Sequence, residues 1–171
     1  MTTRLPVIAL AMGDPAGISP ELTAKLLALD EARAAARIVA FGDRRVLDQG
    51  AEVAALKLDV SYVRPGEAFD ASARPVFVDL GHLDPATVKR CEATPVGGAY
   101  AIENFRQALS MACAGKADAV CFTPFNKQAM RYVYPGYEDE IKFIAEVINF
   151  PGTAREFNIL EGLWNARVTS H

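Results

Sequence analysis

Two polar stretches contain the residue types that could do chemistry, and each follows an apolar run that is typical of a buried strand. The first is MGDPAGISPE at positions 12–21, where Gly13, Asp14 and Gly17 lie among other turn-forming residues. Small residues in such a loop let backbone N–H groups approach a ligand, although the same composition also suits a plain tight turn. Neither a Walker P-loop nor the G-x-G-x-x-G dinucleotide fingerprint is present in this loop.

The second stretch is TPFNK at positions 123–127. Asn126 offers a paired hydrogen-bond donor and acceptor, and Lys127 offers a mobile positive charge, which together suit a carboxylate or a phosphate. A lone lysine is more often a solvent-exposed residue without a binding role, and these two residues alone do not exclude that interpretation. Both stretches are expected at the carboxyl ends of strands, where ligands bind in open α/β sheets.

Few other side chains are candidates for chemistry. His82 lies in a turn-like stretch and His171 ends an apolar strand, and two histidines are too few to complete a metal site. The three cysteines, Cys91, Cys113 and Cys121, have neither metal-site spacing nor an even number. We therefore expect reduced thiols in a cytoplasmic protein, with Cys113 and Cys121 as small core residues.

The elements that must position these residues alternate between strands and helices. Continuous apolar runs predict buried strands, and alternation of apolar and polar residues predicts a half-exposed strand at 58–63. Apolar residues at helical spacing, preceded by residues that commonly start helices, predict the helices. The buried strands are expected at 6–12, 38–41, 76–80 and 117–122, and the helices at 19–29, at 43–56 and from 94 onward. This order predicts an α/β fold with a mainly parallel sheet flanked by helices.

The first helix is expected to begin with Ser19 as its N-cap and Pro20 at its first helical position. The spacing of Leu22, Leu26 and Leu29 predicts that these three leucines form its buried face.

The sequence changes in character after residue 122. A polar and aromatic loop, with or without a short helix, precedes a helix whose core face is predicted to be Ile141, Ile144 and Ile148. Two strands joined near residues 161 and 162 then predict an antiparallel hairpin. We predict a domain boundary between residues 125 and 126. Residues 1–125 form part of a first α/β domain, and 126–171 are the start of a second, incomplete domain.

Composition limits the classes of protein. The chain has 171 residues, 51% of them hydrophobic and 23% charged, with a formal net charge of −3, as in a soluble globular protein. The charge and the absence of a Lys/Arg cluster argue against nucleic acid as a partner. The first apolar run is too short to span a bilayer and lacks a cleavage site, so we expect neither a signal peptide nor a membrane partner.

The opening stretch resembles the signature of the PdxA family, the 4-hydroxythreonine-4-phosphate dehydrogenases. That signature reads M-G-D-P-A-G-I-G-P-E, and Ser19 here replaces a glycine. The segment TPVGGAYAIENFRQALSMACAGKADAVCFTPFNKQAM is similar to the family's central helix, strand and P-x-N-K loop, and GLWNARVTSH resembles the strand that ends in a histidine. The similarity runs from residue 7 to residue 171 and is patchy between residues 44 and 90.

The resemblance implies a homodimeric, two-domain enzyme with the isocitrate and isopropylmalate dehydrogenase type of fold. Such enzymes use NAD or NADP and a divalent metal (zinc, magnesium or cobalt) to oxidise a secondary alcohol of a small-molecule substrate, with decarboxylation following for the namesake substrate. The resemblance also implies that His171 is one of three histidine ligands of the metal. The other two would lie in a remaining half of the protein that is expected after His171. Asn126 and Lys127 would orient the anionic part of the substrate. The residue type of Asp14 favours a role in fixing its loop over one as a catalyst, because Asp before Pro often caps a turn.

One departure from the family bears on the substrate. The family's Gly-His-Thr sequence aligns with Gly136, Tyr137 and Glu138, so Tyr137 and Glu138 are expected in the substrate site. A carboxylate at this position repels a phosphate unless a cation intervenes. Three hypotheses follow: a dehydrogenase of 4-hydroxythreonine 4-phosphate or a related hydroxyacid, a dehydrogenase of an aromatic cis-dihydrodiol carboxylate, and a non-catalytic ligand-binding or assembly domain that kept the fold.

Overall fold

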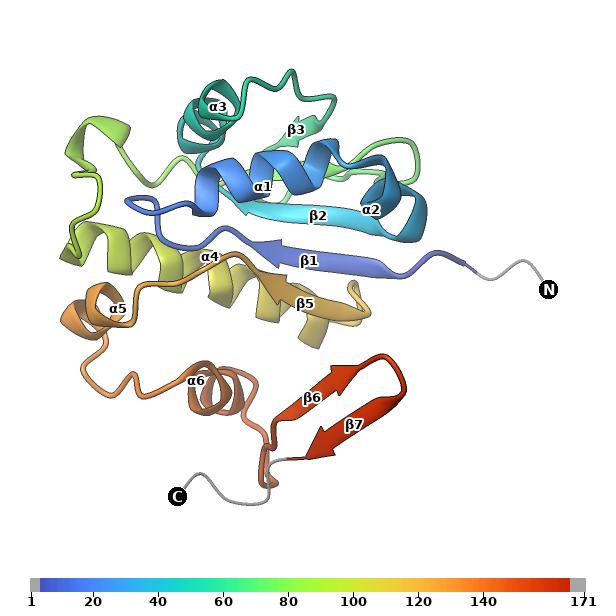
Figure 1. Ribbon diagram of the computed structural model, residues 1–171, viewed down its shortest axis with the longest axis vertical. Coiled ribbons are helices and arrows are strands. Elements are labelled where there is room, and N and C mark those ends of the chain that lie inside the picture. The colour runs from blue at the N-terminus through green and yellow to red at the C-terminus, as the bar shows by residue number, and fades with distance from the viewer. Residues whose placement is uncertain (1–3, 167–171) are drawn as a thin grey trace.

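A five-stranded parallel sheet forms the centre of the protein (Figure 1). The structure, a computed structural model, describes residues 4–166. The strand order is β3-β4-β2-β1-β5, and every neighbouring pair is parallel, as the sequence predicts. The strands are β1 (Val7–Ala11), β2 (Arg37–Gly42), β3 (Ser61–Val63), β4 (Val76–Asp79) and β5 (Ala119–Phe122).

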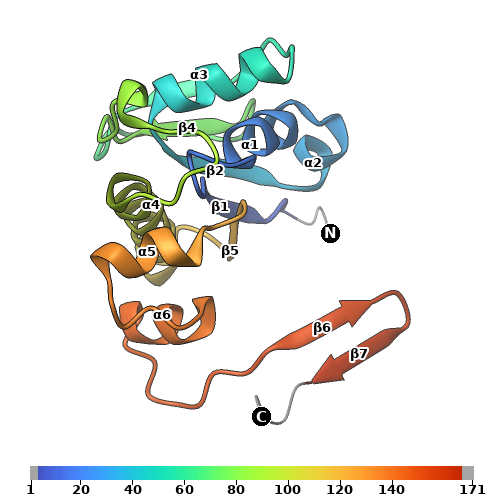
Figure 2. The ribbon, with the colours of Figure 1, turned by 60° about the vertical axis from the view of Figure 1, so that its left-hand side comes forward.

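Helices cover both faces of this sheet. Helices α1 and α3 pack against one another on one face, and α4 lies across the other face with α5 and α6 against it (Figures 1 and 2). None of the helices within residues 4–166 is long and apolar enough to cross a bilayer. The helices are α1 (Ser19–Ala28), α2 (Asp30–Ala35), α3 (Arg44–Val53), the short 3₁₀ helix η1 (Pro85–Thr87), α4 (Pro95–Cys113), α5 (Lys127–Val133) and α6 (Glu140–Val147).

The central strands divide their side chains between two cores. Ala9 and Ala11 of β1 join the core beneath α4, whereas Leu10 and Met12 join the core beneath α1 and α3. Successive strand residues point to opposite faces, so a strand covered on both faces must be apolar at every position. This is the physical reason for the unbroken apolar run near the N-terminus.

Two helices begin with side-chain caps at the positions where the sequence places their starts. The Thr94 hydroxyl accepts a hydrogen bond from the Gly97 N–H at 3.1 Å and begins α4, the long helix expected from that position. Asp43 caps α3 in the same way through the Arg45 N–H. The chain enters each of these helices at a residue that satisfies one of its free N–H groups.

The buried face of α1 differs from the prediction. Ser19 is the first residue of the helix and Ile18 occupies the N-cap position, with no side-chain cap. Leu29 is 47% exposed, because the helix ends before it. The side chains that the helix buries are mostly small, as its close packing against α3 requires: Ser19, Pro20, Thr23, Ala24 and Leu27.

Strand β5 was predicted to be buried, and this is wrong for the described chain. β5 forms the edge of the sheet, and Phe122 is 42% exposed. Val120 packs partly into the core beneath α4, and the exposed Phe122 ring meets the edge of this core at Phe105, with ring centroids 5.2 Å apart. For the same reason Cys121 is exposed, and Cys113, at the end of α4, is exposed as well, so neither is a core residue.

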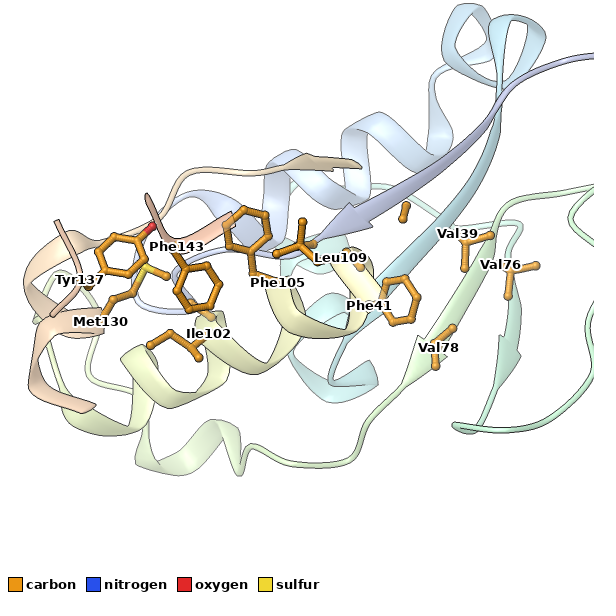
Figure 3. Close-up of a cluster of buried hydrophobic side chains, with 14 residues drawn as sticks. Val39, Phe41, Val76, Val78, Ile102, Phe105, Leu109, Met130, Tyr137 and Phe143 are labelled. Atoms are coloured by element: carbon orange, nitrogen blue, oxygen red, sulfur yellow. The ribbon is translucent and has the colours of Figure 1, made fainter. Parts of the chain in front are cut away.

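Aromatic packing sets the position of α6. The predicted core face was Ile141, Ile144 and Ile148, but Phe143 is the buried residue and Ile148 is 36% exposed. The Phe143 ring stacks on Phe105 of α4 with centroids 5.4 Å apart. The Phe143 ring fills the space against α4 (Figure 3), and of the three predicted isoleucines only Ile144 packs partly against this core.

The chain after α6 forms the predicted antiparallel hairpin. Its strands are β6 (Phe157–Leu160) and β7 (Leu163–Ala166), and Gly162 in the turn has a φ of 74°. The hairpin stands apart from the five-stranded sheet (Figure 2). Helices α5 and α6 instead share the core beneath α4, and the domain boundary near residue 125 stays a prediction.

Candidate functional site

The two loops predicted to carry chemistry leave neighbouring strands at the same edge of the sheet. β1 and β5 are paired in parallel, with Ala11 opposite Phe122. The chain after β1 continues into α1 on one face, and the chain after β5 continues into α5 on the other (Figure 1). Connections that leave adjacent parallel strands to opposite faces define the topological switch point, where ligands bind in such folds.

Backbone contacts hold these paired loops, residues 13–19 and 123–127, against each other. The Gly13 N–H donates to the Thr123 hydroxyl at 3.0 Å, and the Asp14 N–H donates to the Pro124 carbonyl at 2.9 Å. A Cβ atom on Gly13 would lie 2.7 Å from the Pro124 carbonyl carbon and closer still to two carbonyl oxygens. Glycine is therefore required at position 13 by the close approach of the two backbones.

Buried hydroxyl groups complete this contact. The Ser19 hydroxyl donates to the Pro124 carbonyl at 2.6 Å, and the hydroxyl oxygens of Thr23 and Thr123 are 3.3 Å apart. Ser19 was predicted to cap α1, but its side chain instead satisfies a carbonyl of the other loop, as a buried acceptor requires. Sequence reasoning missed the roles of Thr123 and Pro124, because only the pairing of β1 with β5 brings them to the first loop.

Asp14 fixes its own loop. Its Oδ1 accepts a hydrogen bond from the Ala16 N–H at 2.9 Å, which is the turn contact that the sequence indicated. Gly17, further along the loop, lines an open cavity of about 350 Å³ between α1 and α3. Glu21 and Arg90 lie on the wall of the same cavity. The loop is thus rigid at Asp14 and borders open space at Gly17.

Asn126 begins helix α5. Its Oδ1 accepts a hydrogen bond from the Ala129 N–H at 3.1 Å, so the side-chain oxygen serves as the N-cap. The amide N–H groups are what Asn126 can then offer a ligand. The carbonyl of Ala129 also lies against Gly98 of α4, where a Cβ atom would not fit, so α5 is held firmly on α4.

Lys127 is paired with a carboxylate that the sequence did not single out. Its Nζ lies 3.2 Å from Oε2 of Glu140, and the two side chains are 47% and 23% exposed. Glu140 is the first residue of α6, after the N-cap Asp139. An acidic cluster was visible in the sequence, but which carboxylate faces Lys127 depends on the path of the loop between α5 and α6.

Tyr137 and Glu138 occupy different environments. The Tyr137 ring is 1% exposed and lies beside Phe143 in the core (Figure 3), and its hydroxyl has no hydrogen-bond partner among the described residues. Burial, with the nearby charge of Glu140, raises the pKa of Tyr137. Glu138 Oε1 lies 2.6 Å from the Nζ of Lys142 on the surface. The predicted substrate roles of both residues stay predictions.

His82 lies in a second polar cluster at the carboxyl edge of the sheet. The contacts within this cluster hold the loop that carries His82. Its ring stacks on Tyr100 with centroids 4.8 Å apart, and desolvation lowers the pKa of His82. Burial alone would raise the pKa of Asp43, but hydrogen bonds from Arg45 and Leu83 lower it. Asp43 and Arg45 both contact the backbone of Leu83 and so fix the loop that carries His82.

The residues that the structure describes do not form a metal site by themselves. Within residues 4–166, no group of three or more His, Cys, Asp and Glu side chains could hold a metal ion. His171, the predicted metal ligand, lies outside the described residues.

Comparison with known proteins identifies the family. The sequence model of the family described as "Pyridoxal phosphate biosynthetic protein PdxA" matches residues 34–171. The chain belongs to the PdxA family. A protein of Rhizobium meliloti (strain 1021) named "Putative 4-hydroxythreonine-4-phosphate dehydrogenase 2" is 66% identical over 98% of this chain and 49% of its own length. A "D-threonate 4-phosphate dehydrogenase" of Cupriavidus necator is 32% identical over 84% of this chain and 44% of its own length.

Solved structures show the same fold. A 4-hydroxythreonine-4-phosphate dehydrogenase from Burkholderia phymatum superposes with a TM-score of 0.83 at 24% identity, over 98% of this PdxA-family chain and 50% of that chain. A terephthalate 1,2-cis-dihydrodiol dehydrogenase from Burkholderia xenovorans LB400 superposes with a TM-score of 0.64 at 28% identity, over 84% of this chain and 41% of that one. The chain spans about half the length of the curated relatives it matches.

Proposed function

We propose that this PdxA-family chain supplies one half of a cytoplasmic dehydrogenase that oxidises a secondary alcohol of a hydroxyacid with NAD or NADP. The observation that carries the proposal is the pair of loops at the switch point, with Asn126 and Lys127 following β5. The 66% identity with a relative named as a dehydrogenase supports the reaction class. We propose that a remaining half after His171 and a second copy of the protein complete the enzyme.

Residues of this chain would bind and orient the substrate. The Asn126 amide and the Lys127 ammonium would hold its anionic part by hydrogen bonds to oxygen. Because the paired loops are fixed to each other and α5 is fixed to α4, a group bound there has a defined position, which is the main contribution of a protein to such a reaction. The nicotinamide, when bound, accepts the hydride from the alcohol carbon.

We propose that His171 supplies one ligand to a divalent metal, with the others in the remaining half. Residues 4–166 do not provide three ligands by themselves. We expect the full-length protein to contain about one divalent metal per chain and to lose activity on chelation. Mass spectrometry of the metal content, with assays before and after chelation, tests this. Full activity in metal-free protein would remove the metal from the proposal.

A second candidate substrate is an aromatic cis-dihydrodiol carboxylate. Three acidic residues, Glu138, Asp139 and Glu140, lie at the end of the segment that aligns with the family's substrate-binding sequence and directly after it, and their negative charge disfavours a phosphate dianion there. A solved cis-dihydrodiol dehydrogenase is 28% identical to this chain, whereas the relative that is 66% identical is named for the phosphorylated substrate, so the charge argument alone carries this second candidate. A non-catalytic role would show as substrate binding without reduction of the nicotinamide.

Substrate choice follows from this charge distribution. We expect the full-length protein to turn over 4-hydroxythreonine 4-phosphate with a kcat/KM about tenfold lower than that for its best unphosphorylated hydroxyacid or diol, because like charges brought together cost free energy. Side-by-side assays of phosphorylated, unphosphorylated and aromatic substrates with both nicotinamide cofactors check this. Turnover of the phosphorylated compound at the highest rate would contradict the charge argument.

A further inference from the structure

The ion pair between Lys127 and Glu140 joins the first residues of two helices. Lys127 follows the N-cap Asn126 of α5, and Glu140 follows the N-cap Asp139 of α6. Their charged atoms are 3.2 Å apart, so each helix start fixes one partner. Lys127, the cation proposed to bind the substrate, thus already has an anionic partner within the chain.

Helix stability does not explain why a lysine stands at this position. The N-terminus of a helix carries partial positive charge, which favours Glu140 at the start of α6 and disfavours Lys127 at the start of α5. The lysine side chain is 47% exposed, and an ion pair with that exposure adds little to the free energy of folding. The placement of Lys127 therefore points to a role in binding.

The neighbouring cations are engaged by other partners. Arg131 donates to the carbonyl of Tyr137 at 2.9 Å, and Lys142 pairs with Glu138 at 2.6 Å. Among the described residues, Glu140 is thus the carboxylate that directly neutralises Lys127. It also lies near the Tyr137 hydroxyl: burial is the main cause of the raised pKa of Tyr137, and the charge of Glu140 adds to it.

We propose that Glu140 determines which anions the substrate site accepts, favouring a hydroxylated group with one negative charge over a phosphate dianion. A dianion at Lys127 must either displace Glu140 or lie beside its negative charge, and both cost free energy. A hydroxyacid or diol can instead donate its hydroxyl hydrogen to the Glu140 carboxylate while an oxygen accepts from Lys127. This inference rests on the proposed function and assigns to Glu140 the choice between the substrate classes.

Removing the charge of Glu140 should therefore open the site to phosphate. We expect Glu140→Gln in the full-length protein to bind inorganic phosphate about tenfold more tightly by titration calorimetry, which is a change of about 1.4 kcal/mol. Binding of glycolate, a hydroxyacid with one charge, should not tighten. Adding Lys127→Met to Glu140→Gln should abolish the gain for phosphate, because the gain depends on the freed ammonium group.

Glu146→Gln is the matched control. Glu146 lies on the same helix and loses the same charge, but its carboxylate contacts the Tyr134 hydroxyl instead of Lys127. We expect its phosphate affinity to equal that of the parent protein. Circular dichroism verifies that each variant is folded, and Glu140→Ala, which removes the same charge, repeats the test if Glu140→Gln does not fold.

These binding measurements do not depend on turnover. A gain in phosphate affinity in a protein that never reduces a nicotinamide would support the role of Glu140 and refute the dehydrogenase proposal. Unchanged phosphate affinity in the folded Glu140 variants, or a gain that survives the loss of Lys127, would overturn the inference even if the enzyme is a dehydrogenase. An equal gain in phosphate affinity in Glu146→Gln would show that net charge causes the effect, and it would also overturn the inference about Glu140.

Discussion

Replacing Lys127 by methionine in the full-length protein is expected to lower kcat/KM for the true substrate by about 10- to 150-fold. A hydrogen bond to a charged group contributes about 1.5–3 kcal/mol, and methionine keeps the length of the side chain without its charge. The fold should survive, because the side chain is half exposed and its ion pair with Glu140 adds little stability. Steady-state kinetics, with a thermal melt of each protein, measures both effects.

Lys89→Met provides the control for that measurement. Lys89 is 71% exposed and pairs with Glu92, outside the paired loops, so the same substitution there should leave kcat/KM unchanged. A Lys127→Met enzyme with the kcat/KM of the parent would exclude Lys127 from the substrate site. A loss in both variants would show a general effect of charge.

Gly13→Ala is expected to destabilise the protein by about 3 kcal/mol, near the upper end of what overpacking costs. The added methyl group would meet backbone atoms of Thr123 and Pro124, which cannot move away as a flexible side chain could. For a chain of this size, that loss corresponds to a fall in Tm of about 6–12 °C. Thermal unfolding followed by circular dichroism measures it.

Gly17→Ala, four residues further along the same loop, is the matched control. Its nearest neighbour would be the Asp14 carboxylate at 3.5 Å, an ordinary van der Waals contact. We expect a change in Tm of no more than about 2 °C, as for a substitution without a clash. An unchanged Tm in Gly13→Ala would mean that the paired loops are not held as closely as the structure describes.

Much of the fold could be predicted because local rules and tertiary packing agree. The continuous apolar run that becomes β1 is apolar on both faces because each face meets a different core. Thr94 begins the long helix α4 because its hydroxyl satisfies a helix N–H wherever the chain goes next. Such features depend on neighbours in the sequence, which the sequence displays directly.

The failed predictions involve contacts between distant segments. Ser19 looks like a helix cap, yet its hydroxyl binds the carbonyl of Pro124, more than a hundred residues away. The leucine spacing predicts the buried face of α1, yet only Leu26 of the three packs partly against the core, because close packing on α3 favours the small residues. β5 has a buried composition but lies at the sheet edge, where the described chain covers only one of its faces.

The candidate site shows the same division. The sequence identifies Asp14, Asn126 and Lys127 by residue type and by their position after strands. The partner of Lys127 could not be identified, because Glu138, Asp139 and Glu140 are equally acidic and only the start of α6 decides which one reaches the lysine. Charge type is visible in a sequence, whereas charge pairing requires the fold.

The most direct measurement of the central claim is reduction of NAD or NADP by the full-length protein, followed by absorbance with a panel of hydroxyacids and diols. We expect reduction with at least one substrate, fastest for an unphosphorylated hydroxyacid or an aromatic cis-diol carboxylate, and strongly impaired in Lys127→Met. Tight binding of the same compounds without any reduction of either nicotinamide, by folded protein supplied with divalent metal, would contradict it and favour a ligand-binding protein with the same fold.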